Sequence, residues 1–138
     1  MSDPYKLQRF VDAQNPIYDR VLSELRGGRK KSHWMWFVFP QIKGLGRSEL
    51  SIRFAISGRQ ETQAYLDHAV LGPRLRECTT WALKAHPRPI GQIFGSPDDM
   101  KFQSSMTLFD AVAPGEVFGQ ALDAFFGGRR DQATLDTL

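Results

Sequence analysis

The chain has 138 residues, of which 41% are hydrophobic and 24% charged, a composition typical of one globular domain and not of a disordered or fibrous protein. Its single cysteine, Cys78, excludes an intrachain disulfide and a thiolate zinc cluster, so a cytoplasmic, reducing location is the simplest interpretation. No apolar run approaches the roughly 20 residues that span a bilayer, and no signal peptide is visible, so no membrane association is expected.

The apolar residues recur mostly at helical spacing, and alternating strand patterns are nearly absent. A first helix over residues 3–14 has Asp3, or alternatively Ser2, as its expected N-cap, and a second helix over residues 16–26 stops at Gly27. These two segments predict a helical hairpin. The same periodicity predicts helices over 48–57, 59–68, 71–86, 96–115 and 116–128, a single turn within the irregular segment 86–97, and one more turn at 132–138.

Two of these predicted helices have a regular apolar stripe. In the 71–86 segment the stripe repeats at i, i+4, i+7 and i+11 and consists of Leu71, Leu75, Cys78 and Ala82. In the 96–115 segment, for which Ser96 is the expected N-cap, the same spacing gives Phe102, Met106, Phe109 and Ala113. We therefore predict an all-α, compact single domain, a bundle of about six to eight helices over residues 1–138, with a core over 3–127 and a polar C-terminal tail.

The segment HWMWFVFP, residues 33–40, is the one that periodicity does not assign. It is short, continuous and aromatic, so a buried strand and a buried helix fit equally, and Pro40 ends either element. Trp34 and Trp36 either pack in the core or line a cleft and stack a ligand. His33 beside them is either a structural cap or a general acid or base, because imidazole titrates near neutral pH.

Charge is distributed unevenly around this segment. The net charge of the whole chain is only +3, but every charged residue between Glu24 and Glu49 is basic. These residues are Arg26, Arg29, Lys30, Lys31, Lys43 and Arg47. They form either a solvated basic loop or an anion-attracting rim, since clustered cations concentrate negative ligands nearby.

A glycine loop, GLGRS over residues 44–48, follows the aromatic segment. Gly44 and Gly46 permit a close backbone approach, and a helix that starts after Ser48 directs free N–H groups at an anion. The loop is therefore either a structural turn or an anion cradle flanked by Lys43 and Arg47.

The predicted helix over 96–115 supplies a second candidate surface. Lys101, Ser104 and Ser105 are helical neighbours on a side away from the apolar stripe. Helix propensity does not favour two adjacent serines in mid-helix. They either permit close helix packing or present their hydroxyls, with the Lys101 ammonium group, to a ligand.

Four stretches of the chain resemble one known family. They are LQRFVDAQN, HWMWFVFPQIKGLG, AYLDHAVLGPRL and KFQSSMTLFD, and the resemblance covers nearly the whole chain, residues 3–127. Together they are similar to DUF1810, a family of small bacterial and fungal proteins of unknown function. The resemblance implies an all-α domain, which favours helix for the aromatic segment, and it implies no established reaction. Members are sometimes labelled calpastatin, but calpastatin is a disordered inhibitor, whereas this chain is rich in core-forming stripes.

From these residues we expect a soluble domain that binds or processes a small anionic ligand, phosphorylated or nucleotide-like, in an aromatic and basic cleft. The candidate ligand-binding residues are Trp34, Trp36, Gln41, Lys43, Gly44, Gly46, Arg47, Ser48, Lys101, Ser104 and Ser105. His33 is the candidate proton-transfer group if there is a reaction. The alternative is a non-catalytic protein-interaction module whose aromatic residues are purely core.

Two classes of partner are not expected from the sequence. The near-neutral total charge supplies few phosphate contacts, so nucleic acid is not a predicted partner. The common metal-binding and cofactor-binding motifs are missing, so no metal and no cofactor are predicted.

Overall fold

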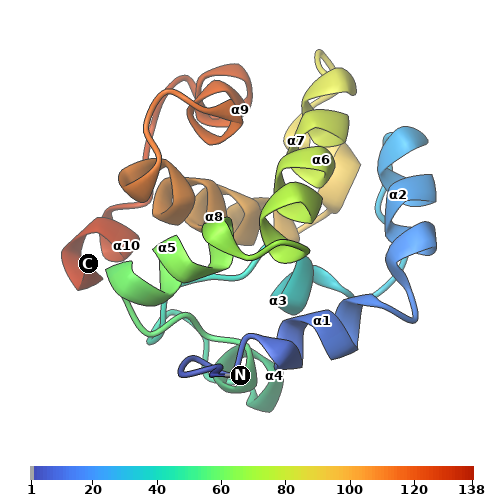
Figure 1. Cartoon of the computed structure of the whole chain (residues 1–138). Helices are drawn as coiled ribbons and strands as arrows, with labels where there is room; N and C mark the ends of the chain where they lie inside the picture. Colours follow the sequence, from blue (N-terminus) through green and yellow to red (C-terminus); the bar gives the residue numbers. More distant parts are fainter. Residues whose placement is uncertain (1) are drawn as a thin grey trace.

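The computed structural model describes residues 2–138, which form ten helices around one hydrophobic core (Figure 1). The helices are α1 (Gln8–Gln14), α2 (Tyr18–Arg26), α3 (Met35–Val38), α4 (Glu49–Arg53), α5 (Arg59–Asp67), α6 (Leu71–Lys84), α7 (Ile90–Phe94), α8 (Asp98–Val112), α9 (Val117–Phe126) and α10 (Gln132–Thr137). Residues 2–138 contain no β-strand, and one isolated parallel bridge joins Ile42 to Ile56. The predicted all-α fold is therefore confirmed. Within the same range, every helix is too short or too polar to cross a bilayer.

The predicted number of six to eight helices is wrong, because residues 2–138 contain ten. Helices α3, α4, α7 and α10 have only four to six residues each. A helix of this length completes little more than one turn, so it has no repeating apolar stripe that a sequence pattern can reveal.

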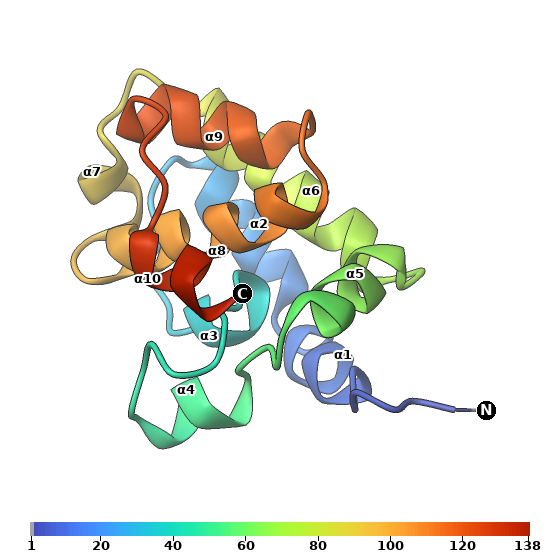
Figure 2. The same cartoon turned by 90° about the vertical axis from the view of Figure 1, so that its left-hand side faces the viewer.

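Helix α8 is the central element of the fold (Figures 1 and 2). Helices α5, α7, α9 and α10 all pack against it. Every residue over 104–110 is buried. The side on which the sequence placed Ser104 and Ser105 is therefore covered as well, because the neighbouring helices surround α8 on more than one side.

The apolar stripe predicted for the 71–86 segment is present in α6. Its four residues are almost completely buried, each with at most 1% of its surface exposed: Leu71, Leu75, Cys78 and Ala82. Helices α2, α5 and α9 pack against α6. Burial raises the pKa of the Cys78 thiol to about 12, so this thiol stays protonated at neutral pH and behaves as a core residue.

The aromatic segment forms a helical turn, α3, and not a strand. Trp34 and Phe39, which flank the turn, are buried. The ring centroid of Phe39 lies 5.7 Å from that of Phe94 and 5.1 Å from that of Phe102, and the rings of Phe94 and Phe102 stack at 4.7 Å. Each such pair stabilises the folded protein by roughly 0.5–1.5 kcal/mol in addition to the contribution of the apolar area that it buries. They join the aromatic segment to α7 and α8.

Two predicted helix starts differ in the structure. The carboxylate of Asp3 accepts from Leu7 N at 2.8 Å and from Gln8 N at 3.0 Å, but the predicted N-cap is wrong, because α1 begins only at Gln8 and Leu7 occupies its N-cap position. These backbone hydrogen bonds, from Gln8 and then Leu7, lower the pKa of the Asp3 carboxyl. At α8 the predicted cap is wrong, because Pro97 occupies the N-cap position in place of Ser96 and no side chain caps the helix.

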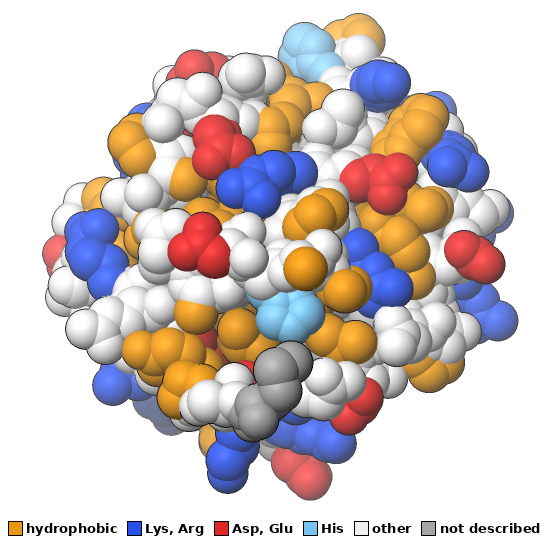
Figure 3. All heavy atoms as spheres, in the orientation of Figure 1, with side chains coloured by type: hydrophobic (Ala, Val, Ile, Leu, Met, Phe, Trp, Pro, Cys, Tyr) orange, Lys and Arg blue, Asp and Glu red, His pale blue; other side chains and the backbone are white. Residues whose placement is uncertain are grey.

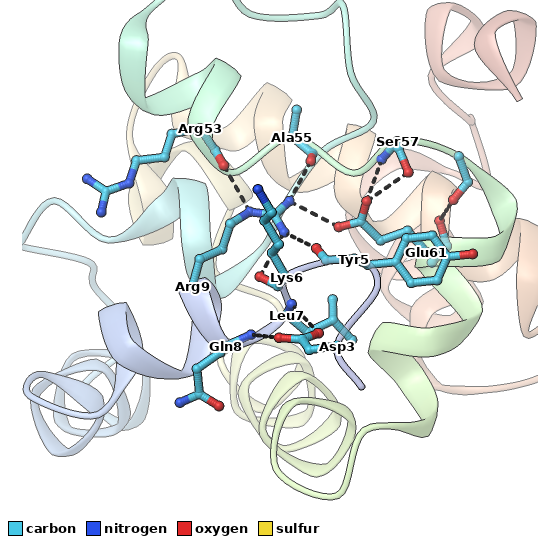
Figure 4. A network of polar contacts seen from close by, with 12 residues as sticks. Asp3, Tyr5, Lys6, Leu7, Gln8, Arg9, Arg53, Ala55, Ser57 and Glu61 are labelled. Carbon is cyan, nitrogen blue, oxygen red and sulfur yellow. Dashed lines mark hydrogen bonds and ion pairs between the residues drawn. The ribbon is translucent and has the colours of Figure 1, made fainter. Parts of the chain in front are cut away.

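Arg9 joins the N-terminal segment to the connection between α4 and α5 (Figure 4). Its guanidinium group donates to the backbone oxygens of Tyr5, Lys6, Arg53 and Ala55 and to the carboxylate of Glu61. The Arg9 Nη2 to Glu61 Oε2 distance is 3.0 Å, and Ser57 donates to the other oxygen of Glu61. Only 4% of the Glu61 side chain is exposed, so these partners replace water around its charge.

The C-terminal segment packs across α8 through α10 (Figure 2). Asp131 Oδ2 accepts a hydrogen bond from Ser104 Oγ at 3.0 Å, and Asp131 N donates to Thr107 Oγ1 at 2.9 Å. Asp131 also caps α10, because the same oxygen accepts from Thr134 N at 3.2 Å. The one turn predicted in the tail is thus a helix anchored on the central helix.

We expect Arg9→Met to lower the free energy of unfolding by about 3 kcal/mol, because the buried carboxylate of Glu61 would lose its cation. Urea denaturation measures this loss. Arg129→Met is the matched control, since the Arg129 side chain is exposed and has no hydrogen bond or ion pair within residues 2–138. The control should change stability by less than about 0.5 kcal/mol. Equal losses in the two variants would contradict the role of Arg9.

Candidate functional site

The connection between α2 and α3, residues 27–34, is held by one carboxylate. Glu24 is buried on the last turn of α2. Its Oε1 accepts from Lys31 N at 2.7 Å, Ser32 N at 3.0 Å and Trp34 Nε1 at 3.0 Å, and Oε2 accepts from Ser32 Oγ at 2.6 Å. Burial raises the pKa of Glu24, but the hydrogen bonds from Ser32, Lys31 and Trp34 outweigh burial and hold the pKa below its ordinary value. Glu24 is therefore charged at neutral pH.

A glycine brings a distant arginine to the same connection. Gly28 has φ +74°, and a Cβ atom there would lie 3.2 Å from Arg88 Nη1. That nitrogen donates to the Gly28 carbonyl oxygen at 3.0 Å, across a sequence separation of 60 residues. The left-handed backbone favours glycine at this position, and a Cβ atom there would push the Arg88 side chain back by a few tenths of an ångström.

A hollow of about 510 Å³ lies between the α1–α2 hairpin and residues 31–37 and is called hollow A here. Its apolar lining consists of Ala13, Pro16, Ile17, Trp34 and Phe37. Its polar lining consists of Asp12, Arg20, Lys31, Ser32 and His33. A concave apolar wall with a few convergent polar groups, at this volume, is the usual form of a small-molecule site.

A second hollow of about 550 Å³, hollow B, adjoins hollow A and shares Arg20, Lys31 and Ser32 with it. The remaining lining of hollow B consists of Ser23, Glu24, Gly27 and Arg29. The charge of Glu24 is already engaged by the four hydrogen bonds from residues 31–34, so the cations dominate this hollow. An apolar chamber and a cationic chamber therefore lie side by side.

Two further hollows continue beyond hollow B. Hollow C, of about 410 Å³, is lined by Arg29, Lys30, Arg88, Gly91, Gln92, Phe94 and Gly95. Hollow D, of about 280 Å³, is lined by Leu25, Arg26, Gly27, Gly28, Trp81, Lys84, Ala85 and Arg88. Arg29 is common to hollows B and C, Arg88 to hollows C and D, and Gly27 to hollows B and D, so hollows B, C and D adjoin one another around residues 27–30, next to hollow A.

Seven cations line these four hollows and are called the basic collar: Arg20, Arg26, Arg29, Lys30, Lys31, Lys84 and Arg88. Lys30 pairs with Asp98 at 2.7 Å. The other six form no ion pair with any residue of the described range 2–138. Figure 3 shows Lys and Arg side chains along the right-hand edge of the molecule, over α2 and α6, with acidic side chains among them. The unpaired cations leave their charge available to an external anion.

His33 and Trp34 are the sequence-predicted residues that line hollow A. His33 is exposed, which leaves its imidazole accessible to a bound molecule. Trp34 is only 1% exposed, and its Nε1 donates to Glu24. Trp34 is therefore a core residue that borders the hollow.

The glycine loop borders a separate hollow of about 200 Å³, hollow E. Four sequence-predicted residues line it: Gln41, Lys43, Gly44 and Gly46. Ser48 caps α4, because its Oγ accepts from Ser51 N at 3.1 Å. A Cβ at Gly46 would lie 2.5 Å from the Ser51 side chain. These two observations explain the loop as a turn, and the anion cradle with the exposed Arg47 stays a prediction.

Among the candidate residues Lys101, Ser104 and Ser105 on α8, Lys101 contacts the aromatic segment. Lys101 Nζ lies 4.9 Å from the ring centroid of Trp36, a cation–aromatic contact between α8 and α3. Ser104 is engaged with Asp131. Ser105 is fully buried, and its Oγ has no hydrogen-bond partner within residues 2–138. The structure thus brings Lys101 to Trp36, whereas both serines belong to the interior.

Three residues that line the hollows were not indicated by the sequence: Asp12, Arg20 and Arg88. Asp12 and Arg20 lie on the α1–α2 hairpin, and Arg88 lies in the irregular segment before α7, so none belongs to an obvious motif. The signal that was present is the basic run over 26–31, which the sequence indicated as an anion-attracting rim. The fold brings further cations from other segments, Arg20, Lys84 and Arg88, next to this basic run.

Comparison with known proteins supports a shared fold without an assigned activity. A family profile described as protein of unknown function (DUF1810) matches residues 4–138. The crystal structure of the conserved hypothetical protein Rv1873 from Mycobacterium tuberculosis is 51% identical in sequence and superposes with a TM-score of 0.93. That match covers 99% of this chain and 98% of the other. No curated protein matches the chain significantly.

We expect Glu24→Gln to lower the free energy of unfolding by about 1–3 kcal/mol at pH 7, because charged acceptors form the stronger hydrogen bonds. The pKa of Glu24 is lowered in the folded protein, so its contribution is present above about pH 4.5 and is lost as the pH falls through the folded pKa. Urea denaturation at pH 7 and at about pH 3 should show that the difference in free energy of unfolding between the unchanged protein and Glu24→Gln is smaller at the acidic pH. Asp19→Asn, an exposed change on α2, is the control. A difference that does not vary with pH contradicts this role.

We expect opposite outcomes for the two adjacent serines of α8. Ser104→Ala should lower the free energy of unfolding by about 1 kcal/mol, because Asp131 would lose a hydrogen bond. Ser105→Ala should leave stability unchanged or raise it by up to about 1 kcal/mol, because it removes an unpartnered buried hydroxyl. Thermal unfolding compares the pair. A clear loss on Ser105→Ala would mean that its hydroxyl has a partner.

Proposed function

The chain belongs to the DUF1810 family, and we propose that it binds a small anionic ligand, phosphorylated or nucleotide-like, in hollows A and B. The observation that carries this proposal is the junction of an apolar chamber with a cationic one. Ile17 and Phe37 line only the apolar chamber, Arg29 lines the cationic one, and Arg20 and Lys31 stand where the two meet. A molecule with a ring at one end and a phosphate at the other matches both chambers.

The charges at this junction suit a phosphate group. Arg20 and Lys31 are exposed and have no ion-pair partner within residues 2–138, so binding an anion breaks no internal pair. A guanidinium group contacts two phosphate oxygens at once, whereas an ammonium group acts as a point charge. The backbone of Lys31 is held in place, because its N–H is bound to Glu24, while its side chain is exposed and able to reach a bound phosphate.

His33 is the residue proposed to transfer a proton if the bound ligand reacts. It stands in hollow A together with Asp12, whose Oδ1 accepts from Gln8 Nε2 at 2.9 Å. An accessible imidazole beside a ligand site is suited to general acid–base chemistry near neutral pH. Binding without reaction needs only the two chambers and their cations.

The glycine loop is the second proposed position for the anion, as the sequence predicted. Hollow E is bordered by Gly44, which has φ +91° and nothing within 4 Å of a Cβ position, so the backbone there is open to a ligand. Lys43 and Arg47 are exposed on either side. Substitutions at Arg20 and at Arg47 separate the two positions.

The alternative function is a protein-interaction module. The observation that favours it lies on α4, where Leu50 and Ile52 have 37% and 66% of their surface exposed. Exposed apolar side chains of this kind are found at protein interfaces. Under this alternative the hollows would hold no small molecule.

We expect phosphorylated ligands to stabilise the protein in a thermal-shift series of adenosine monophosphate, ribose 5-phosphate and ADP-ribose. At about 100 times its Kd, a ligand should raise the free energy of unfolding by roughly 2.7 kcal/mol. Arg20→Gln and Lys31→Gln should each weaken binding roughly 5- to 30-fold, by loss of a charge-assisted hydrogen bond. Isothermal titration calorimetry measures the change in Kd.

Two controls make this result specific. Adenosine, which lacks the phosphate, should bind much more weakly than its monophosphate. Arg129→Gln removes an exposed arginine outside all five hollows and should leave Kd unchanged. If Arg47→Gln weakens ligand binding and Arg20→Gln does not, the anion binds at the glycine loop and not in hollows A and B. No stabilisation by any phosphorylated ligand would favour the interaction module.

A further inference from the structure

The basic collar extends beyond the two hollows assigned to a small ligand. Hollow C follows hollow B through Arg29, and hollow D follows hollow C through Arg88. A ligand of mononucleotide size in hollows A and B would leave Arg26, Lys84 and Arg88 unused. These three side chains are exposed and have no ion-pair partner within residues 2–138. Their charge remains without a role in the function proposed above.

We propose that hollows C and D hold the phosphate backbone of a single-stranded nucleic acid whose terminal nucleotide occupies hollows A and B. This inference rests on the proposed function, since it places the same nucleotide-like group in the same chambers. It changes the ligand class from a free small molecule to the end of a strand. The observation that carries it is that hollows C and D each adjoin hollow B, through Arg29 and Gly27, and that hollow B adjoins hollow A.

The size of the hollows favours one strand over a duplex. Each of them has a volume of about 280 to 550 Å³, which is the scale of a small-molecule pocket and too small to admit a double helix. The cations stand between and around the hollows, where the phosphates of a flexible strand would pass. A positively charged groove that follows the backbone is the usual form of a single-strand site.

Trp81 adds an aromatic side chain to this path. It lines hollow D and is partly exposed. The guanidinium carbon of Arg26 lies 5.0 Å from its ring centroid, and Lys84 Nζ lies 4.6 Å from it. Single-strand sites combine such aromatic rings, on which bases stack, with arginine and lysine that contact the phosphates.

The small net charge of the chain argued against a nucleic-acid partner, but the local charge of the collar matters more for binding. A total of +3 averages over the whole surface, but the collar gathers seven of the 18 lysine and arginine residues around one loop. Four of the seven are arginine, whose planar group suits phosphate oxygens. An acidic peptide would match the charge as well, but it has no base for Trp81. We therefore assign the collar to nucleic acid.

Binding of 5′-phosphorylated thymidine and adenosine oligonucleotides, one and six nucleotides long, tests this inference. In about 50 mM salt we expect the hexanucleotides to bind at least about tenfold more tightly than the mononucleotides. Their affinity should fall with salt at a log–log slope of roughly −2 to −3, as expected for three or four phosphate contacts. Quenching of tryptophan fluorescence should accompany binding and be much smaller in Trp81→Phe.

The variants separate the strand from the terminal nucleotide. Lys84→Gln together with Arg88→Gln should remove the advantage of the hexanucleotide and leave mononucleotide binding unchanged, because neither residue lines hollow A or B. Lys84→Gln alone should remove part of this advantage. Because this variant keeps the hydrogen bond from Arg88 to Gly28, its effect cannot come from a change in the backbone at Gly28. Lys6→Gln together with Arg129→Gln is the matched double control and should change neither affinity, because both residues are exposed and line none of the five hollows.

Each outcome decides between the two proposals. Equal affinity for one and six nucleotides overturns the strand inference and leaves the small-ligand function in place. Hexanucleotide binding that depends on Lys84 and Arg88, without mononucleotide binding, supports the strand site and contradicts the small-ligand function. Hexaglutamate that binds as tightly as the hexanucleotide, regardless of Trp81, overturns the nucleic-acid assignment in favour of an acidic protein partner.

Discussion

The four hydrogen bonds to the Glu24 carboxylate are the interaction on which the candidate site depends. Glu24 is a buried charge without an ion-pair partner in residues 2–138, so backbone and side-chain donors must replace its water. One donor is the indole of Trp34 in the core, and the others belong to Lys31 and Ser32 on the surface. Moving the loop would leave the carboxylate buried and unsatisfied, at a cost of several kcal/mol. The backbone that carries Lys31 and Ser32 is therefore fixed beside the hollows.

The cations of this protein fall into two groups with different roles. Asp98, on the first turn of α8, pairs with Lys30 at 2.7 Å and with Lys101 at 3.7 Å. These two ammonium groups also lie over aromatic rings, Lys30 at 5.2 Å from Trp34 and Lys101 at 4.9 Å from Trp36. They cover the aromatic segment and neutralise a carboxylate, so their charge is used within the fold. Among the other six cations of the collar, Arg26 and Lys84 lie over the Trp81 ring and Arg88 donates to the Gly28 carbonyl oxygen. None of the six is paired with a carboxylate of residues 2–138, which is why the proposed ligand and strand sites are built on them.

The sequence assigned the long helices from their periodicity, but it indicated α7 and α10 only as single turns and left α3 open between helix and strand, for a reason of length. Helix α6 has three full turns and more, so its stripe of buried residues repeats often enough to be recognised. Helices α3 and α7 have four and five residues and show no repeat. For α8 the stripe is confirmed at Phe102, Met106 and Phe109, whereas its fourth residue, Ala113, lies just beyond the end of the helix and is only partly buried. The burial of Ser104 and Ser105 was not predicted, because periodicity reports one face and α8 is covered on several. The family resemblance, and not the pattern, favoured helix for the aromatic segment.

For the candidate site, the sequence by itself determined the all-α class, the two tryptophans beside His33 and the run of basic residues after Glu24. Composition and spacing decide these features, because they depend on neighbours within a few residues. The tertiary structure alone decided which of them meet. It placed His33 with Arg20 and Asp12 in one hollow and the glycine loop in another, and it brought Arg88 across 60 residues to Gly28. Contacts at such separations depend on how helices pack around a shared core, and no local pattern in the chain encodes that packing.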